Sequence, residues 1–376
     1  MFVVILARGV PSPRYPLWGI FELDQARALR AAGHRVAIMA LDIRSGRRIR
    51  RLGFSHQILD GIDVHTLAFP LGLVPVGLEQ ALLDRAFDVV WQRIVSAHGI
   101  PDVVHAHFTK YALAASRSSN RRRFRLVVTE HNSRFSPTGI PSHLRVRAAE
   151  AYRRADAVIA VSEALAQVLT DNFDLPVRVV PNIVDVATFA SLPRRPHDGI
   201  RLVSVGNLLP RKRMALLVEA FALAFADRPE VTLALMGEGP EREQIEQIVE
   251  ASGLGGRVEL LGHCPRSRIA EEFSRSDGFC LLSTWETFGV VFIEALAAGL
   301  PVLASRCGGP EGFLHEGLGL FVETDDAEAV AAGLQRFVSH FRDWRAEAIR
   351  SEAVRLFSPS AVAAQLTDVY AEVCAR

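Results

Sequence analysis

Two glutamates, Glu286 and Glu294, flank the start of a predicted helix in surroundings that suit phosphate chemistry. The apolar run 277–283 before them predicts a buried strand, and backbone amides near Phe288 and Gly289 lie at the amino terminus of the helix that follows. Such amides and the helix dipole favour a phosphate. The segment is therefore a candidate site for a diphosphate leaving group. The alternative is a solvated Glu294 and a capping Glu286.

Two histidines near the end of the apolar run 102–107 form a second candidate. Because side chains alternate along a strand, His105 and His107 lie on one face, with His107 nearer the strand end. Ligands of open parallel sheets bind outside the strand ends, which favours a functional role for His107 and a hydrogen-bonded core role for His105. No third ligand appears at metal-site spacing, so we expect no metal.

Polar or glycine-containing segments follow several other predicted strands. They contain Gly19, His131 with Asn132, the basic turn with Gly206, Asn207, Arg211 and Lys212, and His263. A glycine in the long first loop would let the backbone approach a phosphate closely. Ordinary turn roles remain the alternative for Gly19 and the segment 129–132, and a solvated surface turn is the alternative for the basic turn.

These residues depend on two series of short apolar runs that alternate with helical stretches. The first series is 2–7, 35–40, 63–68, 102–107, 125–130, 157–162 and 177–182, and the second is 200–206, 231–237, 258–263, 277–283, 301–305 and 319–322. This alternation predicts an α/β protein with parallel sheets. We expect two Rossmann-like domains at 1–182 and 200–358, a linker at 183–199 and a final helix within 359–376 that packs back toward the first domain.

Composition excludes several classes of protein. The chain has 376 residues, 49% of them hydrophobic, and a formal net charge of +1, so we expect ordered domains and no nucleic-acid partner. Four scattered cysteines argue against a disulfide framework. No apolar stretch reaches the roughly 18 residues that a membrane span needs. We therefore expect a soluble cytoplasmic protein.

The segment 286–302 resembles the signature of the retaining glycosyltransferases of family 4. That signature is a glutamate, seven arbitrary residues and a second glutamate, commonly followed by A-x-G-x-P-V; Glu286, Glu294, Gly299, Pro301 and Val302 match it. The segment 308–311, Gly-Gly-Pro-Glu, resembles another family segment. The resemblance implies the GT-B fold, in which two Rossmann-like domains face each other across a cleft.

The resemblance also implies a role for each candidate residue. Glu286 and His107 correspond to the catalytic residues beside the donor sugar, and Glu294 to the ribose ligand. The other implied donor-binding residues are Arg211, Lys212, Phe288, Gly289, Gly19, Gly206, Asn207 and His263, and the implied acceptor-side residues are His131 and Asn132. The family often has arginine where this chain has Asn207.

The implied function is transfer of a sugar, with retention, from a nucleotide-diphosphate sugar of the UDP or GDP type to an acceptor hydroxyl. We expect the second domain to bind the donor, the first to bind a carbohydrate or lipid-linked acceptor, and no cofactor or metal to be required. Surface polysaccharide or glycolipid assembly is the expected setting. Basic clusters at 44–51 and 121–125 favour peripheral contact with the inner face of an anionic membrane. A nucleotide-sugar 2-epimerase and a non-catalytic two-lobed sugar-binding protein remain alternatives.

Overall fold

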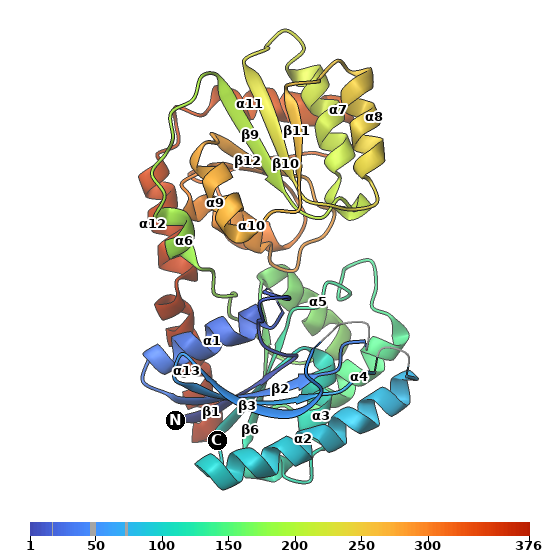
Figure 1. Cartoon of the computed structure of the whole chain (residues 1–376), viewed down its shortest axis with the longest axis vertical. Helices are drawn as coiled ribbons and strands as arrows, with labels where there is room; N and C mark the ends of the chain where they lie inside the picture. The colour runs from blue at the N-terminus through green and yellow to red at the C-terminus, as the bar shows by residue number, and fades with distance from the viewer. Residues whose placement is uncertain (17, 46–49, 72–73) are drawn as a thin grey trace. The chain divides into compact units, whose positions relative to one another are not determined.

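The protein divides into two compact units, Met1–Ile183 with Pro359–Arg376, and Val184–Ser358. The structure, a computed structural model, describes residues 1–16, 18–45, 50–71 and 74–376 (Figure 1). Residues 46–49 of the expected basic cluster at 44–51 lie outside the described residues. Each described unit is built on one sheet.

The first unit alternates strands and helices along the chain. Its strands are β1 (Phe2–Ala7), β2 (Arg35–Asp42), β3 (Gly53–Leu59), β4 (Ile62–Ala68), β5 (Val103–His107), β6 (Arg125–Glu130), β7 (Ala157–Ala160) and β8 (Val177–Val179). Its helices are α1 (Ile20–Ala31), α2 (Val76–His98), α3 (Thr109–Arg117), the 3-10 turn Arg121–Arg123, α4 (Ser142–Arg153), α5 (Glu163–Phe173) and α13 (Pro359–Ala375).

Seven of these strands correspond to predicted runs, but β3 was not predicted. The sheet order within the described residues is β3-β4-β2-β1-β5-β6-β7-β8, and β3 pairs antiparallel with β4 while the other pairs are parallel. The expectation of a purely parallel sheet is therefore wrong at this edge. Asp60 and Gly61 join β3 to β4 with φ of 51° and 74°, the two positive values that a tight type I′ hairpin turn requires. The Asp-Gly pair was the missed sequence signal.

The second unit has an entirely parallel sheet. Its strands are β9 (Ile200–Val205), β10 (Val231–Met236), β11 (Val258–Gly262), β12 (Gly278–Leu281), β13 (Val302–Ser305) and β14 (Gly319–Val322), in the order β11-β10-β9-β12-β13-β14. Its helices are α6 (Val186–Ala190), the 3-10 turns Pro210–Lys212 and Gly309–Gly312, α7 (Met214–Ala224), α8 (Arg242–Ala251), α9 (Arg266–Ser274), α10 (Val290–Ala297), α11 (Ala327–Ser339) and α12 (Ala346–Phe357).

Strand order identifies the place in each sheet where a ligand is expected to bind. In the first sheet the chain moves outward from β1 to β2 and β4, then returns to β5 on the other side of β1. In the second sheet the same reversal occurs between β9 and β12. Helices that follow adjacent strands at such a switch point lie on opposite faces of the sheet, which leaves a crevice outside the strands' carboxyl ends. A ligand is therefore expected at the ends of β1, β5, β9 and β12.

The two segments expected to join the domains belong to one unit each. Within the expected linker 183–199, α6 packs against α9, α10 and α12, so this segment is largely a part of the second unit. Helix α13 packs against α1 in the first unit, and its Tyr370 is fully buried there. The chain therefore crosses between the units twice, near 183 and near 358.

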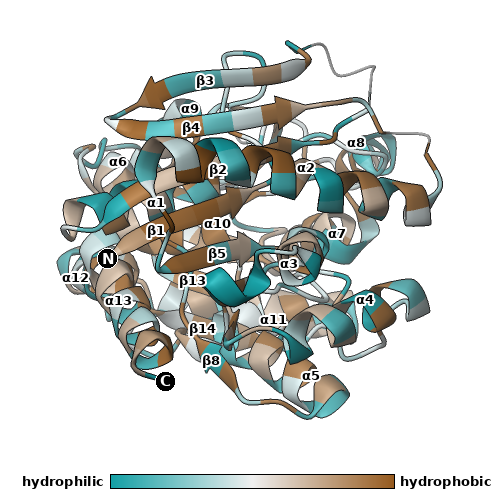
Figure 2. Ribbon diagram, turned by 90° about the horizontal axis from the view of Figure 1, so that it is seen from below, coloured by the Kyte–Doolittle hydropathy of each residue, from teal (hydrophilic) through white to brown (hydrophobic). Residues whose placement is uncertain are grey.

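Apolar strands form the core of the first sheet. Strand β1 is buried along its whole length, and Figure 2 shows hydrophobic colours along β1 and β2 but mixed colours along the edge strand β3. A strand covered on both faces needs apolar side chains on both, whereas an edge strand with one solvated face alternates. Within the described ranges, every helix is too short or too polar to cross a membrane.

Candidate functional site

Lys212 and Glu286 form an ion pair at the switch point of the second sheet. Lys212 follows β9 and Glu286 follows β12, and the lysine Nζ contacts the Glu286 carboxylate. Only 11% and 12% of the two side chains are exposed. Ser283 Oγ donates a second hydrogen bond, of 2.7 Å, to the same carboxylate oxygen. The sequence expectation that these strand ends carry charged groups agrees with the structure, which also brings the two residues into contact.

Backbone hydrogen bonds fix the two loops that carry this pair. Thr284 N donates to Arg211 O at 2.8 Å, which joins the two loops directly. Glu286 N donates to Cys307 O at 2.7 Å. A Cβ atom at Gly239 would lie 2.3 Å from Leu208 O, so the turn after β10 also packs closely on the loop after β9. The ion pair therefore sits on a rigid frame.

Glu294 lies inside α10 and pairs with Arg266, which was not among the predicted site residues. Arg266 Nη2 lies 2.7 Å from Glu294 Oε1, and the Arg266 Nε also donates to this oxygen at 3.1 Å. The Glu294 side chain is 8% exposed. Burial raises the pKa of the Glu294 carboxyl, and Arg266 opposes that shift. Glu294 is thus a held carboxylate and not a solvated helix residue.

The other predicted donor-side residues divide into exposed and buried groups. Gly289 caps α10 with φ of 84°, and the first-turn amides of the helix follow it. Phe288 is 4% exposed and its side chain packs on Phe313 and Phe357, so its backbone amide is the part of this residue that stays a predicted donor contact. The exposed members are Asn207, Arg211 and His263, and Gly206 is half-buried.

His107 forms the centre of the candidate site in the first unit. It is 1% exposed at the end of β5, and its Nδ1 lies 2.8 Å from His131 Nε2, so one ring donates to the other. The His107 Nε2 has no hydrogen-bond partner among the described residues. Burial, with help from the positive charge of Arg8, lowers the pKa of His107 to about 3. At neutral pH His107 is therefore an uncharged imidazole with one uncommitted nitrogen.

His105 is a satisfied core residue. Its Nδ1 is 2.8 Å from Gln25 Nε2 and 2.6 Å from Tyr370 Oη, and its Nε2 is 2.6 Å from Thr129 Oγ1. Both ring nitrogens are therefore committed inside the unit. One of the contacts ties α13 to the first sheet through Tyr370.

Glu130 organises the loop after β6, a role that sequence reasoning missed. Its carboxylate is fully buried and accepts hydrogen bonds from the amides of His131 and Asn132 at 2.8 and 2.9 Å. It also accepts from Thr109 N at 3.0 Å and from Tyr152 Oη at 2.8 Å. Its position at the end of a predicted strand was the available signal. Glu130 holds His131 and Asn132, the two predicted acceptor-side residues, beside the start of α3.

A cavity of about 350 Å³ opens at the switch point of the first sheet. Arg8 enters it from the end of β1 and Phe108 from the end of β5, and Trp18 and Asn132 also line it. The Arg8 guanidinium carbon lies 4.9 Å from the Trp18 ring centroid and 4.8 Å from that of Phe108. Of the predicted acceptor-side pair, Asn132 lines this cavity, and His131 packs against Phe108 with ring centroids 4.9 Å apart.

Gly19 has a local role that the structure explains. It begins α1 with φ of 75°, and a Cβ atom there would lie 2.1 Å from Gly9 O. Only glycine fits both the left-handed backbone and this close approach. The structure therefore shows a packing requirement at Gly19, while contact with a phosphate stays a prediction.

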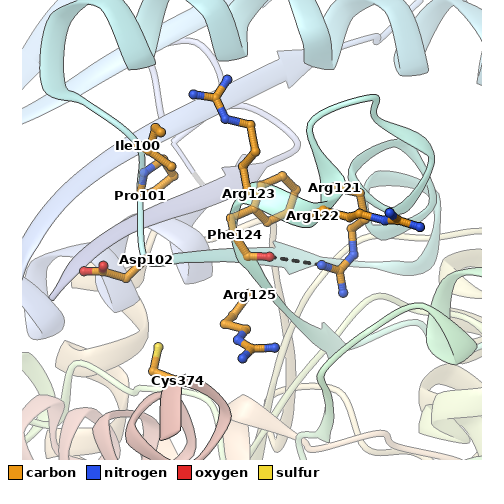
Figure 3. Close-up of a pocket in the computed structure, with 9 residues that line it drawn as sticks. All are labelled: Ile100, Pro101, Asp102, Arg121, Arg122, Arg123, Phe124, Arg125 and Cys374. Carbon is orange, nitrogen blue, oxygen red and sulfur yellow. Dashed lines mark hydrogen bonds between the residues drawn. The ribbon is translucent and has the colours of Figure 1, made fainter. Parts of the chain in front are cut away.

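A second cavity, of about 690 Å³, lies at the opposite edge of the first sheet. It is lined by residues 100–102 before β5, by residues 121–125 at the start of β6 and just before it, and by Cys374. Figure 3 shows that the guanidinium groups of its four arginines point in different directions. Arg121 and Arg125 both pair with Asp156, at 2.7 and 3.3 Å. This basic cluster is thus partly neutralised and has no common focus.

His56, Asp63 and His65 form a separate cluster on β3 and β4. Their donor atoms lie within 4.8 Å of one another, and His56 Nε2 is 2.8 Å from Asp63 Oδ1. Cross-strand pairing of His56 with His65 produces the juxtaposition. The cluster shares no residue with the strand-end sites.

Two Rossmann-like units with charged groups at both switch points define the GT-B class, and comparisons with known proteins agree. Residues 22–188 match the model described as Glycosyltransferase Family 4, and residues 190–350 match Glycosyl transferases group 1. The chain belongs to the family 4 glycosyltransferases with the GT-B fold. The predicted fold class and family are confirmed.

Two curated relatives and one solved structure are among the proteins similar to this chain. The lipopolysaccharide core biosynthesis glycosyltransferase LpsE of Rhizobium meliloti is 29% identical over 60% of this chain and 65% of its own length. The phosphatidyl-myo-inositol mannosyltransferase of Mycolicibacterium smegmatis is 34% identical over 52% of this chain and 51% of its own length. The structure of Anabaena HepE in complex with UDP has a TM-score of 0.73 and 19% identity, covering 99% of both chains. The chain thus covers between half and two thirds of these two curated relatives.

Proposed function

We propose that the protein transfers a sugar from a nucleotide-diphosphate sugar to an acceptor hydroxyl with retention of anomeric configuration. The observation that carries the proposal is the buried Lys212–Glu286 pair at the switch point of the second sheet. A lysine held there stabilises the negative charge that a departing nucleoside diphosphate acquires in the transition state. Because the donor sugar is joined to the diphosphate, a carboxylate beside the phosphate site is also close to the sugar.

The donor is a UDP or GDP sugar in this proposal. Lys212, Arg211 and the first-turn amides after Gly289 stabilise the leaving diphosphate, which needs cationic groups and oriented donors but no redox or carrier chemistry. Glu294 accepts hydrogen bonds from the ribose hydroxyls, and Arg266 fixes the orientation of that carboxylate. The UDP in the similar HepE structure supports a nucleotide diphosphate of this type.

Retention follows from attack on the face from which the diphosphate leaves. The acceptor oxygen forms a bond to the anomeric carbon as the bond from that carbon to the β-phosphate oxygen breaks, and the acceptor proton passes to the departing phosphate. Glu286 and His107 position the donor sugar. An uncharged His107 can hydrogen-bond to a sugar hydroxyl without placing a positive charge near a carbon that itself becomes positive.

The acceptor is a carbohydrate or a lipid-linked sugar in surface polysaccharide or glycolipid assembly. The names of the lipopolysaccharide and phosphatidylinositol relatives support this setting. Peripheral contact with the inner face of an anionic membrane belongs to the same proposal. In this proposal the first unit binds the acceptor beside Asn132 and His131.

Nucleotide binding is tested by thermal unfolding of the protein with UDP, GDP and ADP and their sugar conjugates. Ligand at roughly 100 times its dissociation constant adds about 2.7 kcal/mol to the free energy of unfolding. We expect one nucleotide to raise the melting temperature in the native protein and not in Glu294→Ala. Absence of a shift with every nucleotide contradicts the proposed donor site.

Catalysis is tested by Glu286→Gln, with Glu347→Gln as the matched control because the Glu347 side chain is 85% exposed. We expect Glu286→Gln to bind nucleotide and to transfer sugar about 100-fold more slowly, as when a charge-stabilising group is removed. Unchanged transfer refutes the assigned role. Product formed without any acceptor indicates the epimerase alternative, and NMR of the product reports the anomeric configuration.

A further inference from the structure

We infer that the cavity at the switch point of the first sheet takes an acceptor that carries an anionic group, a phosphate or a carboxylate. The inference rests on the proposed function and deepens it, because it names the chemical class of the acceptor. Three observations support it. They are the excess of positive charge around the cavity, the contacts that hold the charged side chains, and the different arrangement of the arginines in the cavity at residues 100–102 and 121–125.

The cavity has an excess of positive charge. Its lining includes Arg8, Lys110, Arg134 and Arg147 against the single carboxylate of Glu79. These residues come from the end of β1, the start of α3, the loop after β6 and the first turns of α4. Four permanent cations in one concave site with low-dielectric walls focus a positive potential on the space between them. An uncharged sugar alone would not require such a set.

Two of the cations contact carboxylates, and a third, Arg134, is exposed. Lys110 Nζ lies 2.8 Å from Glu79 Oε1, and Arg8 Nε lies 3.4 Å from the buried Glu22. Arg134 is exposed, and within the described ranges no carboxylate oxygen lies within 4.0 Å of its guanidinium. Its backbone amide donates to the Asn132 side chain at 3.0 Å, which fixes the place from which the side chain extends. Arg134 is therefore available to an incoming anion.

The aromatic residues Trp18 and Phe108 hold the Arg8 guanidinium in place. Trp18 Nε1 donates to Arg8 O at 2.9 Å, and the Arg8 guanidinium lies over both the Trp18 and Phe108 rings. Phe108 has φ of 68° where it begins α3, a conformation that an aromatic residue adopts only when its surroundings enforce it. Apolar faces beside cations suit a molecule with a sugar or polyol ring and an anionic substituent.

The cavity at residues 100–102 and 121–125 shows that arginine number alone does not make an anion site. Its guanidinium groups diverge, and two of them share Asp156 (Figure 3). Arg122 and Arg123 are exposed there and belong to the same unit. They provide the matched control for loss of two positive charges outside the proposed site.

The test measures binding of sn-glycerol 3-phosphate and of glycerol to the full chain, by calorimetry. The variants are Arg134→Gln with Arg147→Gln, the control Arg122→Gln with Arg123→Gln, and Lys212→Gln, which weakens any phosphate binding at the donor site. We expect glycerol 3-phosphate to bind more tightly than glycerol. We expect its affinity to fall about tenfold in the 134/147 variant and to change less than twofold in the others, because charge-assisted hydrogen bonds are lost only there.

A second arm distinguishes a free anion from a lipid headgroup. Vesicles of phosphatidylcholine with and without phosphatidylinositol are tested for co-sedimentation with the same proteins. Binding only to the phosphatidylinositol vesicles, lost in the 134/147 variant, assigns the anion to a lipid headgroup. Binding of glycerol phosphate without vesicle binding assigns it to a soluble acceptor. Vesicle binding lost only in the 122/123 control shows adhesion through the other basic surface and overturns a headgroup assignment.

Equal affinity for glycerol phosphate and glycerol, or equal losses in the pocket and control variants, overturns the inference. So does loss of phosphate binding in Lys212→Gln alone, since the anion would then occupy the donor site. Nucleotide titrations of the same samples report separately on the proposed function. A protein that binds nucleotide but no anion in the first unit retains the proposed function and loses this inference. A protein that binds the anion but no nucleotide does the reverse.

Discussion

Burial of His107 predicts a loss of stability in mildly acidic solution. Its folded pKa of about 3 lies below the roughly 6.5 of an unfolded histidine, so the unfolded state binds more protons between these values. The free energy of unfolding therefore decreases as the pH falls from 6.5 toward 3. At pH 5.0 the loss attributable to His107 is about 2 kcal/mol relative to pH 7.5, from the ratio of the two binding polynomials. A folded pKa of 4 would give nearly the same value.

Urea titrations at pH 7.5 and 5.0 measure this loss. His107→Asn serves as the comparison, because the titrating groups that do not contact His107 contribute equally to both proteins. The variant is expected to be less stable at both pH values but to lose about 2 kcal/mol less on acidification. Circular dichroism of the full chain measures the urea unfolding transition of both proteins. Equal losses in the two proteins would refute the conclusion that the structure holds His107 uncharged.

Two further predictions concern packing in the first unit. Gly19→Ala should destabilise it by more than Gly33→Ala does, because both glycines have positive φ, of 75° and 90°, but only Gly19 has a backbone oxygen 2.1 Å from the Cβ position. Gly33→Ala is expected to cost about 1 kcal/mol, and similar midpoints in thermal unfolding would contradict the argument. Tyr370→Phe should cost about 1 kcal/mol through loss of the hydrogen bond to His105, measured by urea unfolding. An unchanged midpoint would mean that this bond does not tie α13 to the sheet.

Most of the fold could be predicted because buried parallel strands have a local signature. An interior strand such as β1 is apolar on both faces, so the run 2–7 is visible in the sequence, and its structural bounds are the predicted ones. Edge strand β3 is largely solvated and has no such run. Its only signal was the Asp60-Gly61 turn. Most other boundaries differ from the predicted runs by two residues or fewer, and β8 ends three residues before the end of the predicted run 177–182.

Only those residues of the candidate sites that lie at strand ends could be predicted from the sequence. Lys212 and Glu286 follow strands and His107 is the last residue of one, so their location depends on local pattern and on the general rule for open sheets. Phe288 was selected for the position of its backbone, but its side chain enters an aromatic cluster that includes Phe357 from a distant helix. No local pattern reveals which side of a loop faces the core.

By itself, the sequence determined which segments are strands and helices and which polar residues end them, because hydrophobic periodicity and turn residues act over a few positions. Only the tertiary structure decided which of those residues meet. Arg266 reaches Glu294, and Lys212 reaches Glu286 74 positions away, because the order of strands in the sheet sets the neighbours of each loop. The same ordering gives His105 and His107 different hydrogen-bond partners, although they lie two positions apart on one face of the strand. The ring nitrogens of His105 are bound by residues distant in the sequence, whereas one nitrogen of His107 has no partner among the described residues.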